Sequence, residues 1–167
     1  MIFRHSNISD FQSISQIIAD AQQSLAALGI DQWQDGYPEK EILLNDITAK
    51  NGYILENEGN IAAIATVVFN YEPTYDYIDG AWQTNSDFAV VHRLAVAKNI
   101  RRSGAAKLIM KNIENLCRKK NIHSIKIDTH KGNIPMQHLI KSLCYTYCGI
   151  IFLETGKERL AFEKIIK

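Results

Sequence analysis

A stretch of small and basic residues in the middle of the chain has the chemistry of an anion site. It runs from Arg93 to Ala106 and reads RLAVAKNIRRSGAA. An apolar strand is expected before it and a helix after it, and the first N–H groups of a helix have no partner within the helix. Together with the helix dipole they attract anions such as pyrophosphate. Four basic side chains surround the turn, namely Lys98, Arg101, Arg102 and Lys107.

Two common nucleotide loops do not fit this stretch. A P-loop requires a Gly-Lys-Ser/Thr sequence, which does not occur here. A dinucleotide-binding turn requires three glycines in the pattern GxGxxG, and only Gly104 is present. Another class of phosphate loop is therefore needed.

The stretch resembles the coenzyme A loop of the GNAT superfamily of acyl-CoA N-acyltransferases. In that loop a strand ending in Val is followed, after a few variable residues, by [RQ]-x-x-G-x-[GA]. Here Val96 ends the strand and Arg101–Ala106 reads RRSGAA. The alternative is that Gly104 is only a packing position at the start of a helix.

The resemblance implies that acetyl-CoA is the cosubstrate, with no metal. It implies hydrogen bonds from the main chain of Leu94–Val96 to the pantetheine arm. The expected contacts to the phosphates come from Arg101, Arg102, Ser103, Gly104, Ala105, Ala106 and Lys107. Asn133 matches the family's asparagine near the pantetheine and adenine-side groups, although a plain helix N-cap is the alternative.

Catalysis requires a polarised thioester carbonyl, a neutral amine and a proton for the leaving thiolate. The resemblance assigns the first task to a backbone N–H near Leu94 or Ala95. The tyrosine that many family members use as the acid stands seven residues after the asparagine, where this chain has Ile140. Tyr145 and Tyr147 are substitute candidates, and each is otherwise an aromatic residue of a half-buried strand.

His92 is the candidate general base, because its side chain titrates near neutral pH and it precedes Leu94 by two residues. A core histidine is the alternative interpretation. Arg93 is expected to pair with Asp87 or Asp128. The remaining central and C-terminal histidines, at 123, 130 and 138, lack the spacing of zinc ligands.

The resemblance places the amine acceptor over the first two helices and the loop between them. That loop offers Trp33 and Tyr37 as aromatic walls for a cation. Asp31 attracts an ammonium group, and Trp82 lies in a tyrosine-rich segment expected to close the pocket. The alternative is that the two loop aromatics anchor the loop to the core. No feature identifies the substrate.

Apolar periodicity and turn residues predict the elements that carry these residues. The expected strands are Ile2–His5, Gly52–Glu56, Ile61–Asn70, Phe88–Val96, Ile125–Thr129, Tyr145–Leu153 and Arg159–Ile166. The expected helices cover Phe11–Leu28, a segment from Pro38 past Ile47, Ser103–Lys120 and Asn133–Leu143.

The order β-α-α-β-β-β-α-β-α-β-β indicates an α/β (α+β) fold in which one mixed sheet carries helices on both faces. The resemblance implies a mostly antiparallel, twisted sheet of about seven strands, whose two central parallel strands splay apart. The 167 residues fit one domain, 1–167. The apolar final hairpin offers an edge for a homodimer.

Charge is unevenly distributed along a chain whose net charge is only +1. Residues 1–97 carry −9, residues 98–120 carry +7 and residues 121–167 carry +3. The small total argues against a nucleic-acid partner. The basic segment suits coenzyme A phosphates, and the acidic half suits a cationic amine.

The cysteine count and the hydropathy pattern point to the cytoplasm. There are three cysteines, no signal peptide pattern and no apolar run of membrane-spanning length. Cys144 and Cys148 are expected to be small apolar fillers, too far apart along a strand for a disulfide.

The sequence thus predicts an N-acetyltransferase that moves acetyl from acetyl-CoA directly to a primary amine of a small molecule or peptide. A non-catalytic acyl-CoA sensor on the same fold is the first alternative, because of Ile140. A nucleic-acid module that uses residues 98–120 is the second, and it would show steeply salt-dependent binding.

Overall fold

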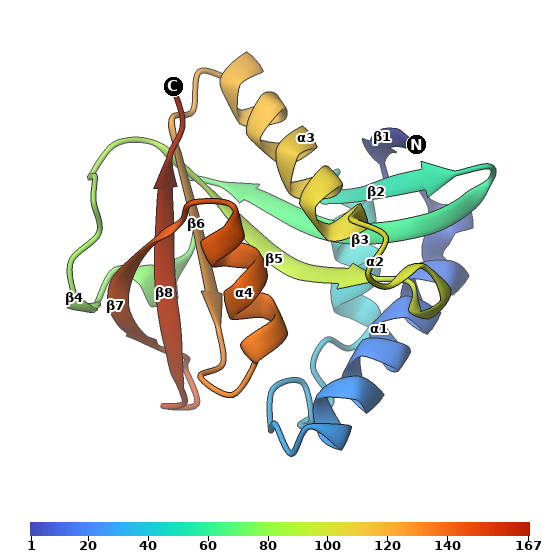
Figure 1. Cartoon of the computed structure of the whole chain (residues 1–167), viewed down its shortest axis with the longest axis horizontal. Helices are drawn as coiled ribbons and strands as arrows, with labels where there is room; N and C mark the ends of the chain where they lie inside the picture. Colours follow the sequence, from blue (N-terminus) through green and yellow to red (C-terminus); the bar gives the residue numbers. More distant parts are fainter. The chain divides into compact units, whose positions relative to one another are not determined.

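The computed structural model describes residues 1–167 as one eight-stranded sheet with four α-helices (Figure 1). The strands are β1 (Ile2–His5), β2 (Gly52–Asn57), β3 (Asn60–Phe69), β4 (Asp79–Gly80), β5 (Phe88–Val96), β6 (Ser124–Thr129), β7 (Thr146–Phe152) and β8 (Glu158–Ile165). The α-helices are α1 (Phe11–Ala27), α2 (Lys40–Thr48), α3 (Ala105–Lys119) and α4 (Ile134–Ser142). Short 3-10 helices occupy Ile8–Asp10, Pro73–Tyr75 and Lys98–Ile100.

The strand order is β1-β2-β3-β5-β6-β8-β7-β4, which confirms a mixed and mostly antiparallel sheet. The parallel pair is β5 with β6, joined from Phe88–Val90 to Ser124–Lys126. Both strands continue beyond the paired stretch, β5 to Val96 and β6 to Thr129. The ladder therefore ends before the residues expected to bind the pantetheine arm.

The strand that the sequence missed is β4, which lies within the polar connection after β3. It has two residues, and it pairs with β7 through Gly80 opposite Gly149. A Cβ on either glycine would overlap the backbone of the other strand, so only glycine permits this close approach. Two residues are too few for a periodic signal, so the sequence predicted seven strands.

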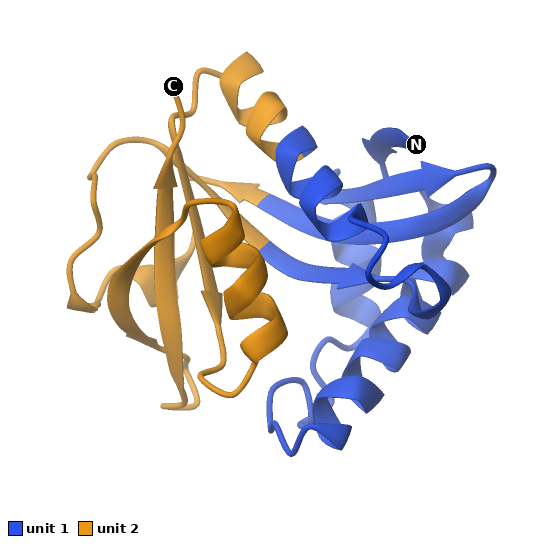
Figure 2. Cartoon of the chain, in the orientation of Figure 1, with its two compact units in different colours: residues 1–67, 92–112 blue, residues 68–91, 113–167 orange.

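Residues 1–67 and 92–112 form one compact unit, called unit 1 here (Figure 2). Within it, α1 and α2 pack on β2, β3 and the end of β5. The core residues of this layer are Ile14, Ile17, Ile18, Leu43, Ile47, Ile54, Ile64, Ala95 and Ala97. Leu55 and Ala63, which alternate with Ile54 and Ile64, are also fully buried, so both faces of the sheet are covered here.

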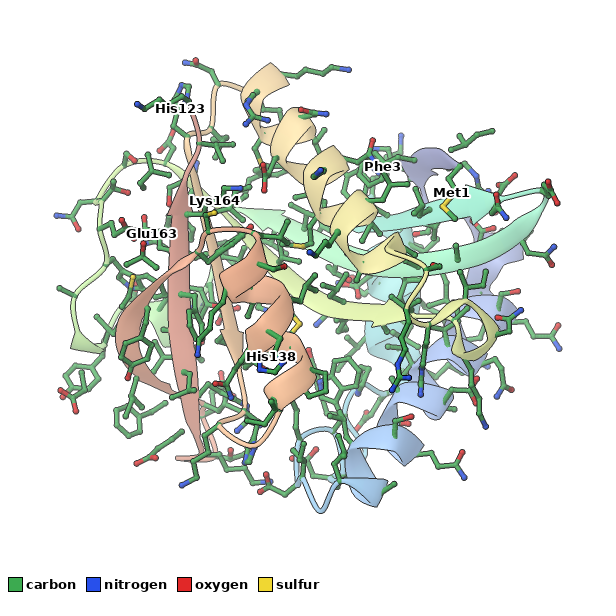
Figure 3. All side chains as sticks on the ribbon, in the orientation of Figure 1. Met1, Phe3, His123, His138, Glu163 and Lys164 are labelled. Carbon is green, nitrogen blue, oxygen red and sulfur yellow. The ribbon has the colours of Figure 1, made fainter.

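Residues 68–91 and 113–167 form the second compact unit, unit 2 (Figure 2). Figure 3 shows Glu163 and Lys164 as neighbours on its strand β8. Glu163 accepts hydrogen bonds from Thr84 and Ser124, whereas Lys164 forms an ion pair of 2.6 Å with Glu114 of α3. The two side chains therefore face opposite sides of the sheet.

The cysteine interpretation is correct for Cys148 and wrong for Cys144. All three thiols are free, and Cys148 is buried as expected. Cys144 is exposed, because it lies just after α4 with a left-handed φ of 63° and ends that helix instead of entering a strand.

Candidate functional site

The centre of the candidate site is an irregularity in β5 at Arg93. This residue has a φ of 50°, a left-handed backbone conformation that is rare for an arginine within a strand. Such residues are held by their surroundings and cluster at functional sites. The irregularity lies between His92 and the expected pantetheine-binding residues Leu94–Val96.

Arg93 is held by a buried network within unit 1. Its Nε and Nη2 donate to the two carboxylate oxygens of Asp46 in α2, each over 2.7 Å. Thr66 of β3 donates to the same carboxylate over 2.8 Å, and the Arg93 Nη1 donates to the hydroxyl of Tyr37. The Arg93 side chain is 11% exposed and the Asp46 side chain 10%, so this forked pair is almost fully removed from water.

The Arg93 guanidinium keeps its charge despite this burial. Burial by itself lowers its pKa, but Tyr37 and Asp46 outweigh that effect and raise the pKa above its ordinary value. The expected pairing of Arg93 with Asp87 or Asp128 is therefore wrong. Asp128 instead accepts a hydrogen bond of 2.7 Å from the Tyr75 hydroxyl.

Sequence reasoning missed Asp46 and Thr66, although one signal for Asp46 existed. It lies three residues after Leu43 and one before Ile47, which places an acidic side chain beside the apolar stripe of its helix. A carboxylate at such a position needs a cation when it is buried. Nothing along the chain indicates which cation that is.

Beyond the irregularity, β5 continues through Leu94, Ala95 and Val96. Ala95 packs into the core under α1 and α2, whereas its two neighbours are half-buried. After the strand, the Ala97 N–H donates to the Ala62 carbonyl of β3 over 2.9 Å. This bond holds one side of the chain where it turns into the basic loop.

The loop from Arg101 to Gly104 is exposed and opens directly into α3. Gly104 has a φ of 87°, and a Cβ built there would meet no atom within 4 Å. The glycine is therefore required by its backbone conformation, and open space lies above it. Ala105 is buried and Ala106 half-buried, so the first turn of a 15-residue helix presents its N–H groups beside that space.

The four basic residues around the loop do not all face the same way. Lys98, Arg102 and Lys107 are exposed. Arg101 turns onto α1, where its Nη1 donates to the Ser24 hydroxyl over 2.8 Å and its Nη2 donates to the Asp20 carbonyl over 3.3 Å. Arg101 thus fastens the loop to α1 in this conformation.

The acid and base candidates lie on different elements. His92 is half-buried in β5 within unit 1, and Tyr147 is 54% exposed in β7 within unit 2. The ring of Tyr147 also packs edge to face against that of Phe162, with 5.6 Å between the ring centroids. Ile140 is 1% exposed in α4, so the position where many family members carry a tyrosine is a core residue in this chain.

Tyr145 is more buried than a half-buried strand aromatic would be. It lies just before β7 at 6% exposure, and its hydroxyl has no hydrogen-bond partner. Burial raises the pKa of Tyr145 well above its ordinary value, with Glu114 and Cys117 adding to the effect. This phenol therefore stays protonated at neutral pH.

Asn133 is the N-cap of α4 in unit 2, where its side-chain oxygen accepts a hydrogen bond of 3.2 Å from the Met136 N–H. This contact is the one expected of a plain cap. The contact to a cofactor implied by the resemblance stays a prediction.

The acceptor loop, defined as residues 31–37, follows α1 in unit 1. Trp33 packs against the core under α1, which supports an anchoring role for it. Asp31 is exposed, and the Tyr37 carbonyl accepts a hydrogen bond of 3.0 Å from Gln22 of α1. Tyr37 is half-buried and also lies under the Arg93 guanidinium, at 5.8 Å from ring centre to Cζ.

Trp82 belongs to unit 2, whereas the acceptor loop belongs to unit 1. Its indole N–H donates to the Tyr75 carbonyl over 3.0 Å, and the Lys126 ammonium lies 4.4 Å from its ring centre. These contacts fasten the segment after β3 to the sheet of unit 2.

Two further findings concern metals and membranes. No group of three or more His, Cys, Asp or Glu side chains is arranged to hold a metal ion. No helix of the structure has both the length and the apolar character needed to cross a membrane.

Known proteins share the sequence pattern and the fold of this chain. A family model described as "Acetyltransferase (GNAT) family" matches residues 13–144, which is most of the chain. This chain belongs to the GNAT acetyltransferase family. The matched range includes the Arg93 network, the loop at Gly104 and Asn133. No curated protein sequence matches this GNAT chain.

Solved structures of other acetyltransferases share the fold of this chain. A GNAT acetyltransferase from Streptococcus agalactiae 2603 is 30% identical, with a TM-score of 0.90 over 99% of this chain and 95% of that one. One from Listeria monocytogenes 4b F2365 shares the fold at 15% identity and a TM-score of 0.77, over 99% of this chain and 94% of that one. A ribosomal-protein-alanine N-acetyltransferase from Brucella melitensis has a TM-score of 0.72 at 18% identity, over 99% and 100%.

Proposed function

We propose that this GNAT protein is an N-acetyltransferase that moves an acetyl group from acetyl-CoA directly to a primary amine of a small molecule or peptide. The observation that carries the proposal is the loop between β5 and α3. It combines the RRSGAA pattern, a left-handed Gly104 with open space above it, and the exposed start of a 15-residue helix. Such a helix start favours a phosphate group.

The residues of this loop fit the pyrophosphate of coenzyme A. The small side chains at Ser103–Ala106 allow oxygen atoms to approach the backbone N–H groups. Lys98, Arg102 and Lys107 are exposed and add positive charge. Arg101 either remains on α1 or turns toward a phosphate, and its hydrogen bonds to Ser24 and Asp20 oppose that turn.

The transfer needs three actions from the chain: polarisation of the thioester carbonyl, removal of a proton from the amine, and supply of a proton to the leaving thiolate. The amine nitrogen attacks the thioester carbonyl carbon to form a tetrahedral intermediate, and the C–S bond breaks when this intermediate collapses to the amide. A backbone N–H near Leu94 or Ala95 is proposed to stabilise the negative charge on the carbonyl oxygen. Both residues follow the irregularity at Arg93, which changes the direction of the strand just before them.

The proton transfers are assigned to His92 and Tyr147. His92 is proposed to accept a proton from the amine or from the tetrahedral intermediate, since a neutral imidazole nitrogen is a proton acceptor. Tyr147 is the proposed donor to the thiolate, and its exposure leaves the hydroxyl accessible. The buried Tyr145 is the less suitable donor, because its raised pKa opposes loss of the proton.

The acceptor is proposed to bind at the loop of residues 31–37, with Trp82 as a further contact. Tyr37 offers an aromatic face and Asp31 an exposed carboxylate, which together suit a cationic amine. Residues 1–97 carry a charge of −9, and this excess raises the local concentration of cations. The brucellar neighbour acts on an alanine of a ribosomal protein, according to its name, so a peptide amine belongs in any screen.

The decisive experiment measures release of free coenzyme A thiol from acetyl-CoA in the presence of an amine panel. The panel contains linear alkyl diamines, free amino acids and short peptides with free N-termini. We expect acetyl-CoA to bind in calorimetry and at least one amine to give turnover. Absence of binding would refute the proposal.

The alternative function is a non-catalytic acyl-CoA sensor, and the observation that favours it is the buried Ile140. A sensor binds acetyl-CoA tightly but releases no thiol with any amine. The same pair of measurements therefore separates an enzyme from a sensor.

The proposal also includes a cytoplasmic location, in keeping with three free thiols, and a homodimer formed through the final hairpin. The two-residue β4 pairs with Gly149–Ile150 of β7 and leaves the remainder of that edge for a partner copy. Sedimentation of the purified protein tests the homodimer.

A further inference from the structure

The Arg93 network joins the acceptor loop to the strand that carries the proposed catalytic backbone. The three guanidinium nitrogens of Arg93 donate to the carboxylate of Asp46 and to the hydroxyls of Tyr37 and Thr66. Asp46 belongs to α2, which follows the acceptor loop in the chain, and Tyr37 is the last residue of that loop. All three residues belong to unit 1.

We propose that Arg93 is a positioning residue that sets the acceptor loop, through the Tyr37 hydroxyl, relative to the backbone of residues 94–96. The inference rests on the proposed function, because it concerns where the amine meets the thioester. Arg93, on the strand expected to bind acetyl-CoA, would then help to determine which amine is accepted.

The geometry of the guanidinium supports this role. Its planar fork binds the two oxygens of Asp46 side by side, and this fixes the plane of the fork. The remaining nitrogen, Nη1, then points in one direction, and Tyr37 lies there with both its hydroxyl and its ring against the cation. Arg93 adopts this arrangement with a left-handed backbone, φ 50°, within the strand.

The environment makes the arrangement rigid. Asp46 and Arg93 are nearly excluded from water, so neither charge can exchange its partner for solvent without a large cost. Thr66 occupies a further lone pair of the carboxylate and touches the Arg93 Nε at 3.3 Å. The hydroxyl of Tyr37 thus accepts a hydrogen bond from a fixed donor. The hydrogen bonds between the acceptor loop and α1 instead use the flexible side chains of Gln22 and Gln34.

The test compares Tyr37→Phe with Thr48→Val. Tyr37→Phe removes the hydroxyl that connects the acceptor loop to Arg93. Thr48→Val removes a hydroxyl outside the network, which donates within α2 to the Asn45 carbonyl over 3.2 Å. For the panel amine that the unaltered protein acetylates fastest, we expect Tyr37→Phe to raise the KM of the amine at least tenfold. The Kd of acetyl-CoA should stay within twofold for both variants, and Thr48→Val should leave the KM of the amine within twofold.

A double-mutant cycle with Arg93→Lys checks that the two residues act together. Lysine keeps the charge beside Asp46 but lacks the fork that reaches Tyr37. We expect Arg93→Lys combined with Tyr37→Phe to raise the KM of the amine no further than Arg93→Lys does alone. Independent, multiplicative effects would overturn the proposal.

A measurement on the free protein keeps this test separate from the proposed function. Hydrogen exchange of residues 31–37 should be at least fivefold faster in Tyr37→Phe and within twofold of the unaltered protein in Thr48→Val. Unchanged exchange in Tyr37→Phe would overturn the positioning role. If no panel amine is acetylated, the proposed function fails, and the exchange rates still decide whether Arg93 holds the loop.

Discussion

At the scale of single residues, the site depends on a few polar side chains that the fold removes from water. Arg93 and Asp46 form a forked ion pair in unit 1, and Thr66 donates a further hydrogen bond to the same carboxylate. Buried charges are tolerated where their partners are complete, and each pair therefore restricts the local backbone to one arrangement. His92 stands next to such a restricted position, which favours a well-defined orientation.

The role of His92 can be tested by substitution. If it is the general base, His92→Ala should lower kcat at least tenfold and leave the Kd of acetyl-CoA within twofold, because the loss concerns proton transfer and not binding. Thiol release and calorimetry measure the two quantities.

His5 provides the matched control for this substitution. Its ring lies against that of Tyr53 with 4.3 Å between the ring centroids and a tilt of 33°, and it has no proposed chemical task. His5→Ala should retain the kcat of the unaltered protein. Full activity of His92→Ala would make His92 a structural residue.

A second prediction at this scale concerns Asp10 and acid. Its carboxylate accepts two hydrogen bonds from Arg4, at 2.8 and 3.0 Å, and one from the Asn7 N–H. The Arg4 hydrogen bonds outweigh burial, so the pKa of Asp10 is lowered below its ordinary value. A group with a lowered folded pKa stabilises the fold above the unfolded pKa, here about 3.9. This stabilisation is lost as the pH falls through the folded value.

We therefore expect Asp10→Asn to reduce the free energy of unfolding at pH 7 by about 1–2 kcal/mol. The difference from the unaltered protein should narrow as the pH falls below about 4. Urea unfolding at several pH values measures it, and the exposed Asp76→Asn serves as the control. A difference that is constant between pH 7 and pH 2 would contradict the ion-pair explanation.

At the scale of elements, the loop between β5 and α3 combines features that can be separated by experiment. Its glycine needs a left-handed backbone, while its open space and helix start suit an anion. A large acidic side chain at this position would bring a negative charge to the proposed phosphate site.

Gly104→Glu should therefore weaken acetyl-CoA binding at least a hundredfold in calorimetry. Gly156→Glu is the matched control, because Gly156 has a φ of 79° and also has no atom within 4 Å of a built Cβ. It carries the same backbone strain, but it lies in the turn between β7 and β8. Equal losses of affinity in both variants would refute the position of the phosphate site.

At the scale of the whole molecule, the two compact units share secondary structure. The boundary between them cuts β3 between Val67 and Val68, β5 between Val91 and His92, and α3 between Asn112 and Ile113. Neither unit can lose its structure without breaking two strands and a helix that it shares with the other. We therefore propose that residues 1–167 fold as one domain.

Unfolding in urea should then be a single transition. Tryptophan fluorescence reports on Trp33 in unit 1 and Trp82 in unit 2, and circular dichroism reports on the helices of both. We expect the midpoints from both methods to coincide, and Trp33→Phe and Trp82→Phe variants assign the fluorescence to one unit at a time. Two separate midpoints would contradict a single domain.

Much of the fold could be predicted because its signals are local. The stripe of apolar residues in α1, the turn between β2 and β3, and the small residues before α3 all lie within a few positions of one another. The strand β4 could not be predicted, since its two residues owe their conformation to a glycine of β7 about seventy positions away.

The same division holds for the site. The family resemblance and the proposed position of the phosphate loop followed from the sequence alone, because a strand, a turn and a helix start are consecutive in the chain. The partner of Arg93 emerged only from the packed structure, since Asp46 lies 47 positions away and competes with other carboxylates along the chain. Pairing of buried charges depends on which side chains the packed elements bring together, and that choice is made only once the core has formed.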